Sequence, residues 1–162
     1  MSRTIAVIPS QGERFTSEIV EDDHGRVYFM ADADIDCDGG SNPHHDPCWQ
    51  PDTTLHHHGR PIDSETVPGL VVPPAIIRGV RGIVLGCRAR ATNTRTGQSA
   101  DAVVFDQGPT RKTGELSPAL AKLIGINPNP NTGGEDSPVV LYELWPGEAA
   151  VVNGVTYALQ PA

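Results

Sequence analysis

Long apolar runs and positive charge are both scarce in this 162-residue sequence. The longest early apolar run covers only residues 5–8, too short for the core of a Sec signal, and no stretch has the apolar length of a membrane span. Twelve basic residues against 20 acidic ones give a formal net charge of −8. Because a nucleic-acid-binding domain needs a basic face, we expect no nucleic-acid partner, whereas a cationic partner is compatible with this charge.

Cysteine is also sparse, with only Cys37, Cys48 and Cys87. Three cysteines are too few for a disulfide-rich scaffold, and none of them forms a Cys-x-x-Cys pair. Cys37 and Cys48 could pair in an oxidising compartment, whereas the spacing of cysteines and histidines matches no recognised zinc motif. We therefore expect no metal centre and no cofactor, and the sequence leaves the redox compartment open.

Glycine and proline, in contrast, are abundant, at 17 and 15 residues. They interrupt the chain too often for a bundle of long helices. A length of 162 residues is typical of one domain, and 38% apolar residues suffice for a buried core. We expect a single domain that spans residues 1–162.

Short β-type runs bounded by glycine or proline recur along the chain, at residues 4–8, 26–30, 70–72, 83–85, 102–105, 139–144 and 149–159. The last run is broken by Asn153-Gly154, a pair that favours the tight turn of a hairpin. One helix is well signalled, with Ser117 as its cap, Pro118 in its first turn and Gly125 at its end. The pattern is typical of a mainly β domain, most economically a small barrel.

The predicted helix should place one apolar stripe against the core, formed by Leu116, Leu120, Leu123 and Ile124. After it, residues 126–137 read INPNPNTGGEDS and should form a loop, because turn-forming residues dominate the segment.

Charges are segregated along the chain. Residues 21–52 hold nine acids and one basic residue, Arg26, whereas residues 78–95 carry five arginines and no acid. The two stretches either face each other across the fold or form separate surfaces. Solvated faces are the simplest interpretation, since most surface ion pairs contribute little to stability.

Two carboxylates follow an apolar strand in VVFDQGPTRKTGELS, residues 103–117. Asp106 ends the strand, a Gly108-Pro109 turn follows, and Glu115 precedes the helix. Strand ends often carry reactive groups, and different surroundings can give two carboxyl groups the different pKa values that acid and base catalysis require. The structural alternative is that Asp106 caps a turn and Glu115 favours the helix N-terminus.

Four aspartates alternate in ADADIDCDGG, residues 31–40, namely Asp32, Asp34, Asp36 and Asp38. On an extended chain they share one face, where their mutual repulsion favours a bound cation. Residues 34–39 fit the start of a calcium loop, but the twelfth position of that loop is His45 instead of the required glutamate. The other interpretations are subsites for a polycationic substrate and a solvated acidic loop.

These motifs together resemble the family 75 glycoside hydrolases, the fungal-type chitosanases and their bacterial relatives. The matching segments are DADIDCDGG (32–40), DPCWQPDTTLHHHG (46–59), SETVPGLVVPP (64–74) and VVFDQGPTRKTGELSPALAKLIGI (103–126), within a resemblance that covers residues 26–160. Residues 92–126 are also similar to the barrel core of rare lipoprotein A, the expansins and family 45 endoglucanases.

The resemblance implies a six-stranded, double-psi-like β-barrel with one or two short helices and long loops. It implies an endo-acting chitosanase that hydrolyses β-1,4 glucosamine linkages with inversion, with Asp106 as general base and Glu115 as general acid. The partner is then a cationic amino-sugar polysaccharide, and the action is extracellular. The alternatives are a peptidoglycan-cleaving enzyme, associated with a phage or a secretion system, and a non-catalytic polysaccharide-binding barrel.

Substrate contacts are predicted for the four alternating aspartates and for Trp49. Trp49 lies between Pro47 and Pro51, where an exposed indole could stack on a sugar ring. We expect the protein to act as a monomer.

Overall fold

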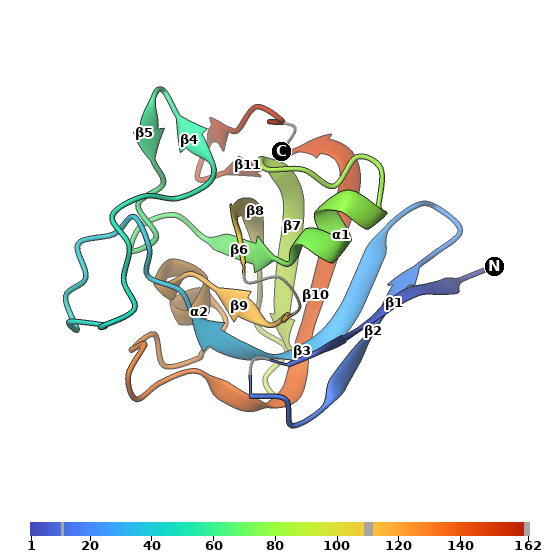
Figure 1. The fold of residues 1–162 in the computed structure, drawn as a ribbon, viewed down its shortest axis with the longest axis horizontal. Helices are drawn as coiled ribbons and strands as arrows, with labels where there is room; N and C mark the ends of the chain where they lie inside the picture. The colour runs from blue at the N-terminus through green and yellow to red at the C-terminus, as the bar shows by residue number, and fades with distance from the viewer. Residues whose placement is uncertain (11, 109–111, 161–162) are drawn as a thin grey trace.

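Strands dominate the computed structural model, which describes residues 1–10, 12–108 and 112–160 (Figure 1). They are β1 (Arg3–Pro9), β2 (Thr16–Glu21), β3 (Val27–Ile35), β4 (His56–His57), β5 (Arg60–Pro61), β6 (Gly69–Val72), β7 (Cys87–Asn93), β8 (Ser99–Gln107), β9 (Glu115–Leu116), β10 (Glu135–Ala149), β11 (Val151–Val152) and β12 (Val155–Thr156). The helices are α1 (Pro74–Gly79) and α2 (Pro118–Leu123). The prediction of a mainly β fold is confirmed.

Within the described residues, six strands close into a barrel in the order β3-β10-β7-β8-β6-β9 and back to β3. The closing contact is a parallel pairing of β3 with β9, and β6 runs parallel to β8 but antiparallel to β9. The hairpin of β1 and β2 extends the same sheet beyond β3 and forms one flank of the molecule (Figure 1). The predicted closed six-stranded barrel with short helices is therefore confirmed.

Apolar side chains fill the barrel. Phe29 of β3 and Tyr142 of β10 stack inside it with ring centroids 5.2 Å apart, and both are almost fully buried. Burial of large apolar side chains of this kind is the main stabilising contribution, at about 1.5–3 kcal/mol each. The Tyr142 hydroxyl donates a hydrogen bond of 2.6 Å to the backbone carbonyl of Asp32, so that the core fixes β3 at the start of the acidic run.

Helix α2 begins and ends where the sequence predicts. The Ser117 hydroxyl accepts a hydrogen bond from the Leu120 backbone N–H, and Gly125 adopts a φ of +77° just after the helix. The predicted apolar stripe is only partly correct, because Leu116 lies in β9 and Leu123 is 52% exposed. Each described helix has six residues, and none has the length or hydropathy needed to cross a membrane.

Other predicted boundaries shift. Residues 83–85 do not form a strand, since only Leu85 makes an isolated bridge, to Gln160. The loop predicted for residues 126–137 is shorter, because β10 already begins at Glu135. At the Asn153-Gly154 turn both residues have positive φ angles, and the predicted hairpin forms there with strands of only two residues each.

Candidate active site

Neighbouring strands bring Asp106 and Glu115 together. Val71 of β6 pairs in register with Asp106 of β8 on one side and with Glu115 of β9 on the other. Paired residues point to the same face of a sheet, and both acids line the same pocket. Because adjacent strands lie about 4.8 Å apart, the two backbones are about 10 Å apart across Val71.

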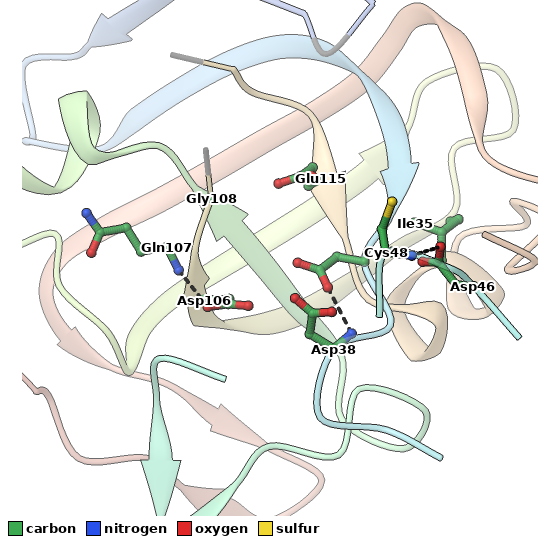
Figure 2. Close-up of a pocket in the computed structure, with 9 residues that line it drawn as sticks. Ile35, Asp38, Asp46, Cys48, Asp106, Gln107, Gly108 and Glu115 are labelled. Carbon is green, nitrogen blue, oxygen red and sulfur yellow. Dashed lines mark hydrogen bonds between the residues drawn. The ribbon is translucent and has the colours of Figure 1, made fainter. Parts of the chain in front are cut away.

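The pocket between these strands has a volume of about 180 Å³ and is dominated by carboxylates (Figure 2). Five acids line it, together with Ile35, Cys48, Gln107 and Gly108, and the acids are Asp36, Asp38, Asp46, Asp106 and Glu115. None of the described residues that line the pocket carries a positive charge. The volume admits several water molecules, at about 30 Å³ each, beside a small polar group of a ligand.

Glycines on two sides make room for the Glu115 side chain. A Cβ atom on Gly108 would lie 2.8 Å from Glu115 Oε2 and 2.9 Å from Val71 Cγ1. Gly114 has a φ of +97°, and a Cβ atom there would collide with the Asp32 carboxylate. Glycine is therefore required at position 114, and a larger residue at position 108 would displace the Glu115 carboxyl group or Val71. Pro109, the second residue of the predicted turn, lies outside the described residues.

The Asp106 carboxylate is held firmly at the end of β8. Its Oδ1 atom accepts hydrogen bonds from the Thr54 N–H at 3.1 Å, from the Thr54 hydroxyl at 2.5 Å and from the Gln107 N–H at 3.0 Å. Burial raises the pKa of Asp106, and these three donors act in the opposite direction because they favour the ionised form. The turn cap considered from the sequence would use the N–H two residues on, at Gly108, but this N–H donates to the Val72 carbonyl at 3.0 Å.

Glu115 has different surroundings. Burial, followed by the nearby charges of Asp36 and Asp34, raises the pKa of Glu115 to about 8. Its carboxyl group is therefore largely protonated at neutral pH, which a general acid requires. The residue lies in β9, two positions before the helical cap, and not in the first turn of α2.

The alternating aspartates separate because β3 ends at Ile35. Asp36 and Asp38 come after the strand and both line the pocket. Asp36 Oδ1 accepts a hydrogen bond of 2.9 Å from the Asp38 N–H, and Asp38 Oδ1 accepts one of 2.8 Å from the Gln50 N–H. Burial is the main reason that the pKa of Asp36 is raised to about 7.

The structure separates the four aspartates that the sequence places on one face, because only Asp36 and Asp38 line the pocket. Asp32 is only 5% exposed, and its carboxylate packs against Gly114, so it is too deeply buried to contact a polymer. Asp34 pairs in register with Glu115 on the neighbouring strand and is not among the residues that line the pocket. Its charge helps to raise the pKa of Glu115.

Asp36, Asp38 and Asp106 each offer one oxygen atom, and the three atoms lie within 4.8 Å of one another. In Figure 2 the carboxylates of Asp38 and Asp106 face each other. One cation, organic or metallic, could contact all three at this spacing. The calcium loop considered from the sequence started at Asp34, which does not belong to this group, and no cysteine or histidine of the described chain joins it.

The cysteines of the acidic segment are free thiols, so the disulfide considered for Cys37 and Cys48 is not formed. The Cys37 thiol instead donates a hydrogen bond of 3.4 Å to Asp46 Oδ2, and burial raises the pKa of Cys37 to about 12.

Trp49, for which the sequence predicts a sugar contact, is half-buried and does not line the pocket. Its indole N–H donates a hydrogen bond of 3.1 Å to the Gly40 carbonyl.

Asp46 and Thr54 are site residues that sequence reasoning did not single out. Two sequence features could have identified Asp46 as a site residue: it lies in the acidic stretch of residues 21–52, and it begins the motif DPCW. Thr54 lies in the same matching segment, residues 46–59, but nothing local points to its contact with Asp106, which joins residues 52 positions apart.

A larger hollow of about 530 Å³ lies over β2 and β3. It is lined mainly by apolar and aromatic side chains, such as Phe15, Tyr28 and Met30, and Glu18 is the one acid among its described lining residues. Acid–base chemistry needs several titratable groups close together, which favours the smaller, acid-lined pocket as the functional site.

Neither a scan against models of known protein families nor a search of curated proteins finds a match for this sequence. The family resemblance of the motifs therefore stays a hypothesis, and the geometry of the pocket is the main basis for assigning a function.

Proposed function

We propose that the protein is an endo-acting glycoside hydrolase that cleaves a cationic amino-sugar polymer of the chitosan type with inversion. One observation carries the proposal: Asp106 and Glu115 flank Val71 in a single pocket whose other charged residues are all acids. The resemblance of the sequence motifs to family 75 glycoside hydrolases points to the same pair of residues.

In this mechanism Glu115 is the general acid and Asp106 is the general base. The raised pKa of Glu115 keeps a proton available for the leaving glycosidic oxygen. Asp106, whose ionised form accepts three hydrogen bonds, takes a proton from a water molecule. The oxygen of this water attacks the anomeric carbon from the face opposite the bond that breaks.

The spacing of the strands supports an inverting reaction. Inverting glycosidases hold their carboxyl groups roughly 6.5–9.5 Å apart to admit water, whereas retaining enzymes need about 5 Å. Two acids that flank a middle strand, with backbones about 10 Å apart, fit the wider spacing more easily. A retaining reaction would require the two side chains to lean strongly toward each other across Val71.

The remaining acids of the pocket support the substrate class. Asp36, Asp38 and Asp46 lie beside the proposed catalytic pair without a basic side chain among the described lining residues. Glucosamine units of chitosan carry ammonium groups, which such a cluster attracts. An N-acetylated polymer such as chitin lacks these charges, so we expect it to bind more weakly.

The proposal is tested by incubating the protein separately with chitosan, chitin and purified peptidoglycan and by analysing the soluble products by mass spectrometry. We expect glucosamine oligomers from chitosan and little from chitin. Peptidoglycan fragments alone would replace chitosan with a cell-wall substrate, and binding without any product would indicate a polysaccharide-binding barrel. Parallel reactions with a chelator should release the same products, since loss of activity with recovery on calcium addition would make the acid cluster a metal site.

A further inference from the structure

One oxygen atom of the Asp106 carboxylate accepts every hydrogen bond that this group forms with the described residues. The Thr54 N–H, the Thr54 hydroxyl and the Gln107 N–H converge on Oδ1, and no hydrogen bond of the described residues ends on Oδ2. In Figure 2 the Asp106 oxygen that is not bonded to Gln107 points toward Asp38 and the pocket. The two oxygens of this carboxylate therefore have different surroundings.

Thr54 is held in place by both of its neighbours in the chain. The Leu55 N–H donates a hydrogen bond of 3.0 Å to the Phe105 carbonyl, which fastens this segment to β8 directly before Asp106. The buried Thr53 hydroxyl donates to the Leu55 carbonyl at 2.7 Å and accepts from the Ile62 N–H at 2.9 Å. The backbone around Thr54 is thus anchored independently of the Thr54 side chain, which is itself exposed.

We propose that Thr54 is the positioning residue of the general base: it fixes Oδ1 of Asp106, so that Oδ2 receives the proton of the attacking water. This inference rests on the proposed hydrolase function. Rotation of the carboxylate would break three hydrogen bonds at once, so Oδ2 stays directed into the pocket. During the reaction the water O–H bond breaks as the Oδ2–H bond forms, and the water oxygen joins the anomeric carbon as the glycosidic bond breaks.

The hydrogen bonds of Thr54 have a second consequence, because donors to an ionised carboxylate favour the ionised form. Removing the Thr54 hydroxyl therefore raises the pKa of Asp106. The acidic limb of the pH–rate profile, below which the base is protonated, must then move to higher pH. A residue that only supports the fold would lower the amount of active protein without moving this limb.

The test compares Thr54→Val, which removes the hydroxyl and keeps the shape, with Thr54→Ser, which keeps a donor. Thr94→Val is the matched control, because the exposed Thr94 hydroxyl donates to the Val139 carbonyl away from the pocket. We expect Thr54→Val to lower kcat on chitosan by about tenfold or more, with little change in KM. Thr54→Ser should recover most of the rate, and Thr94→Val should match the wild type.

A kcat for Thr54→Val within about twofold of the wild type, with an unmoved acidic limb, would overturn the positioning function. Equal losses in the serine and valine variants would also contradict it. If the wild-type protein itself releases no product, the hydrolase proposal fails. The effect of Thr54 on the Asp106 carboxylate can still be tested without an activity assay. A ¹³C NMR titration of the Asp106 carboxyl group should then still show a higher pKa in Thr54→Val, and an unchanged pKa would overturn the inference.

Discussion

Acids on the barrel wall and acids in the pocket differ in whether a positive charge accompanies them. On the wall, Arg90 contacts Asp101 at 3.1 Å and Arg95 contacts Glu135 at 2.7 Å, while Arg88 lies 3.6 Å from Glu148. The pocket acids Asp36, Asp38 and Asp46 form no ion pair with any described residue. No ion pair among the described residues joins residues 78–95 to residues 21–52.

The fold neutralises the acids of the barrel wall with arginines, whereas it leaves the charges of the pocket acids available for a ligand. Exposed pairs such as Arg90 with Asp101 contribute at most about 1 kcal/mol each, and losing one should change little. The half-buried pocket acids have no cation beside them, so burial first, and then their mutual repulsion, raises the pKa values of Asp36 and Glu115. Arrangements that oppose stability in this way are typical of functional sites.

The largest expected effect is the loss of activity in Glu115→Gln, which keeps the shape of the acid but has no proton to donate to the leaving oxygen. We expect chitosan hydrolysis to fall by about 10²–10⁴-fold, and Asp106→Asn should behave similarly because an amide is a poor base. Asp101→Asn is the control from the wall, since it breaks the pair with Arg90 and should leave the rate unchanged. Full activity of Glu115→Gln in an assay of released oligomers would remove Glu115 from the mechanism.

A smaller effect is expected for substrate binding. In a Glu115→Gln background, which prevents turnover, Asp36→Asn or Asp38→Asn should weaken binding of a glucosamine oligomer by about tenfold, as expected for the loss of one charged contact. Isothermal titration calorimetry at low and high salt would also show weaker binding at high salt. Asp32→Asn should leave the affinity unchanged, because Asp32 is buried behind Gly114. Equal losses of affinity in Asp32→Asn and Asp36→Asn would instead support the single acidic binding face predicted from the sequence.

A further effect concerns the free energy of unfolding and its dependence on pH. The pKa of Glu115 rises from an ordinary value of 4.5 to about 8 on folding, so between these values the folded chain binds more protons than the unfolded chain. The free energy of unfolding therefore falls as the pH rises through this range, and the stability present below pH 4.5 is lost as the pH approaches 8. Urea unfolding midpoints measured near both ends of the range should show a smaller decline in Glu115→Gln than in the wild type. Asp101→Asn should retain the wild-type decline, and an unchanged decline in Glu115→Gln would contradict the raised pKa.

The strands that were predicted have an ordinary β-type composition, although β2, with the sequence TSEIVE, was missed in spite of its Ile19 and Val20. Strand β7 was missed because its sequence, CRARATN, alternates buried alanines with arginines, and alanine is not enriched in strands. Helix α2 was predicted despite its six residues because Ser117 and Gly125 are local signals at its ends. The closure of the barrel through β9 was invisible in composition, since that strand consists of only Glu115 and Leu116.

In the candidate site, too, residues with signals in the neighbouring sequence could be predicted, whereas residues brought in by tertiary packing could not. Asp106 and Glu115 were predicted because strand, glycine and helix signals surround them within a short segment. The four aspartates do not all reach the pocket because the extended strand that their alternation predicts ends at Ile35. The chain turns there, and Asp36 accepts a hydrogen bond from the Asp38 N–H. Which segment lies beside Asp106 depends on tertiary packing, and no local pattern around Thr54 encodes that contact.

The most direct test of the central claim is the configuration of the sugar ends that the protein produces from chitosan. ¹H NMR spectra recorded in the first minutes of the reaction, before mutarotation, distinguish the two anomers. Inversion at a β-1,4 linkage by Asp106 and Glu115 predicts that α-anomeric reducing ends appear first. The initial appearance of β-anomers, or the absence of new reducing ends, would contradict the account.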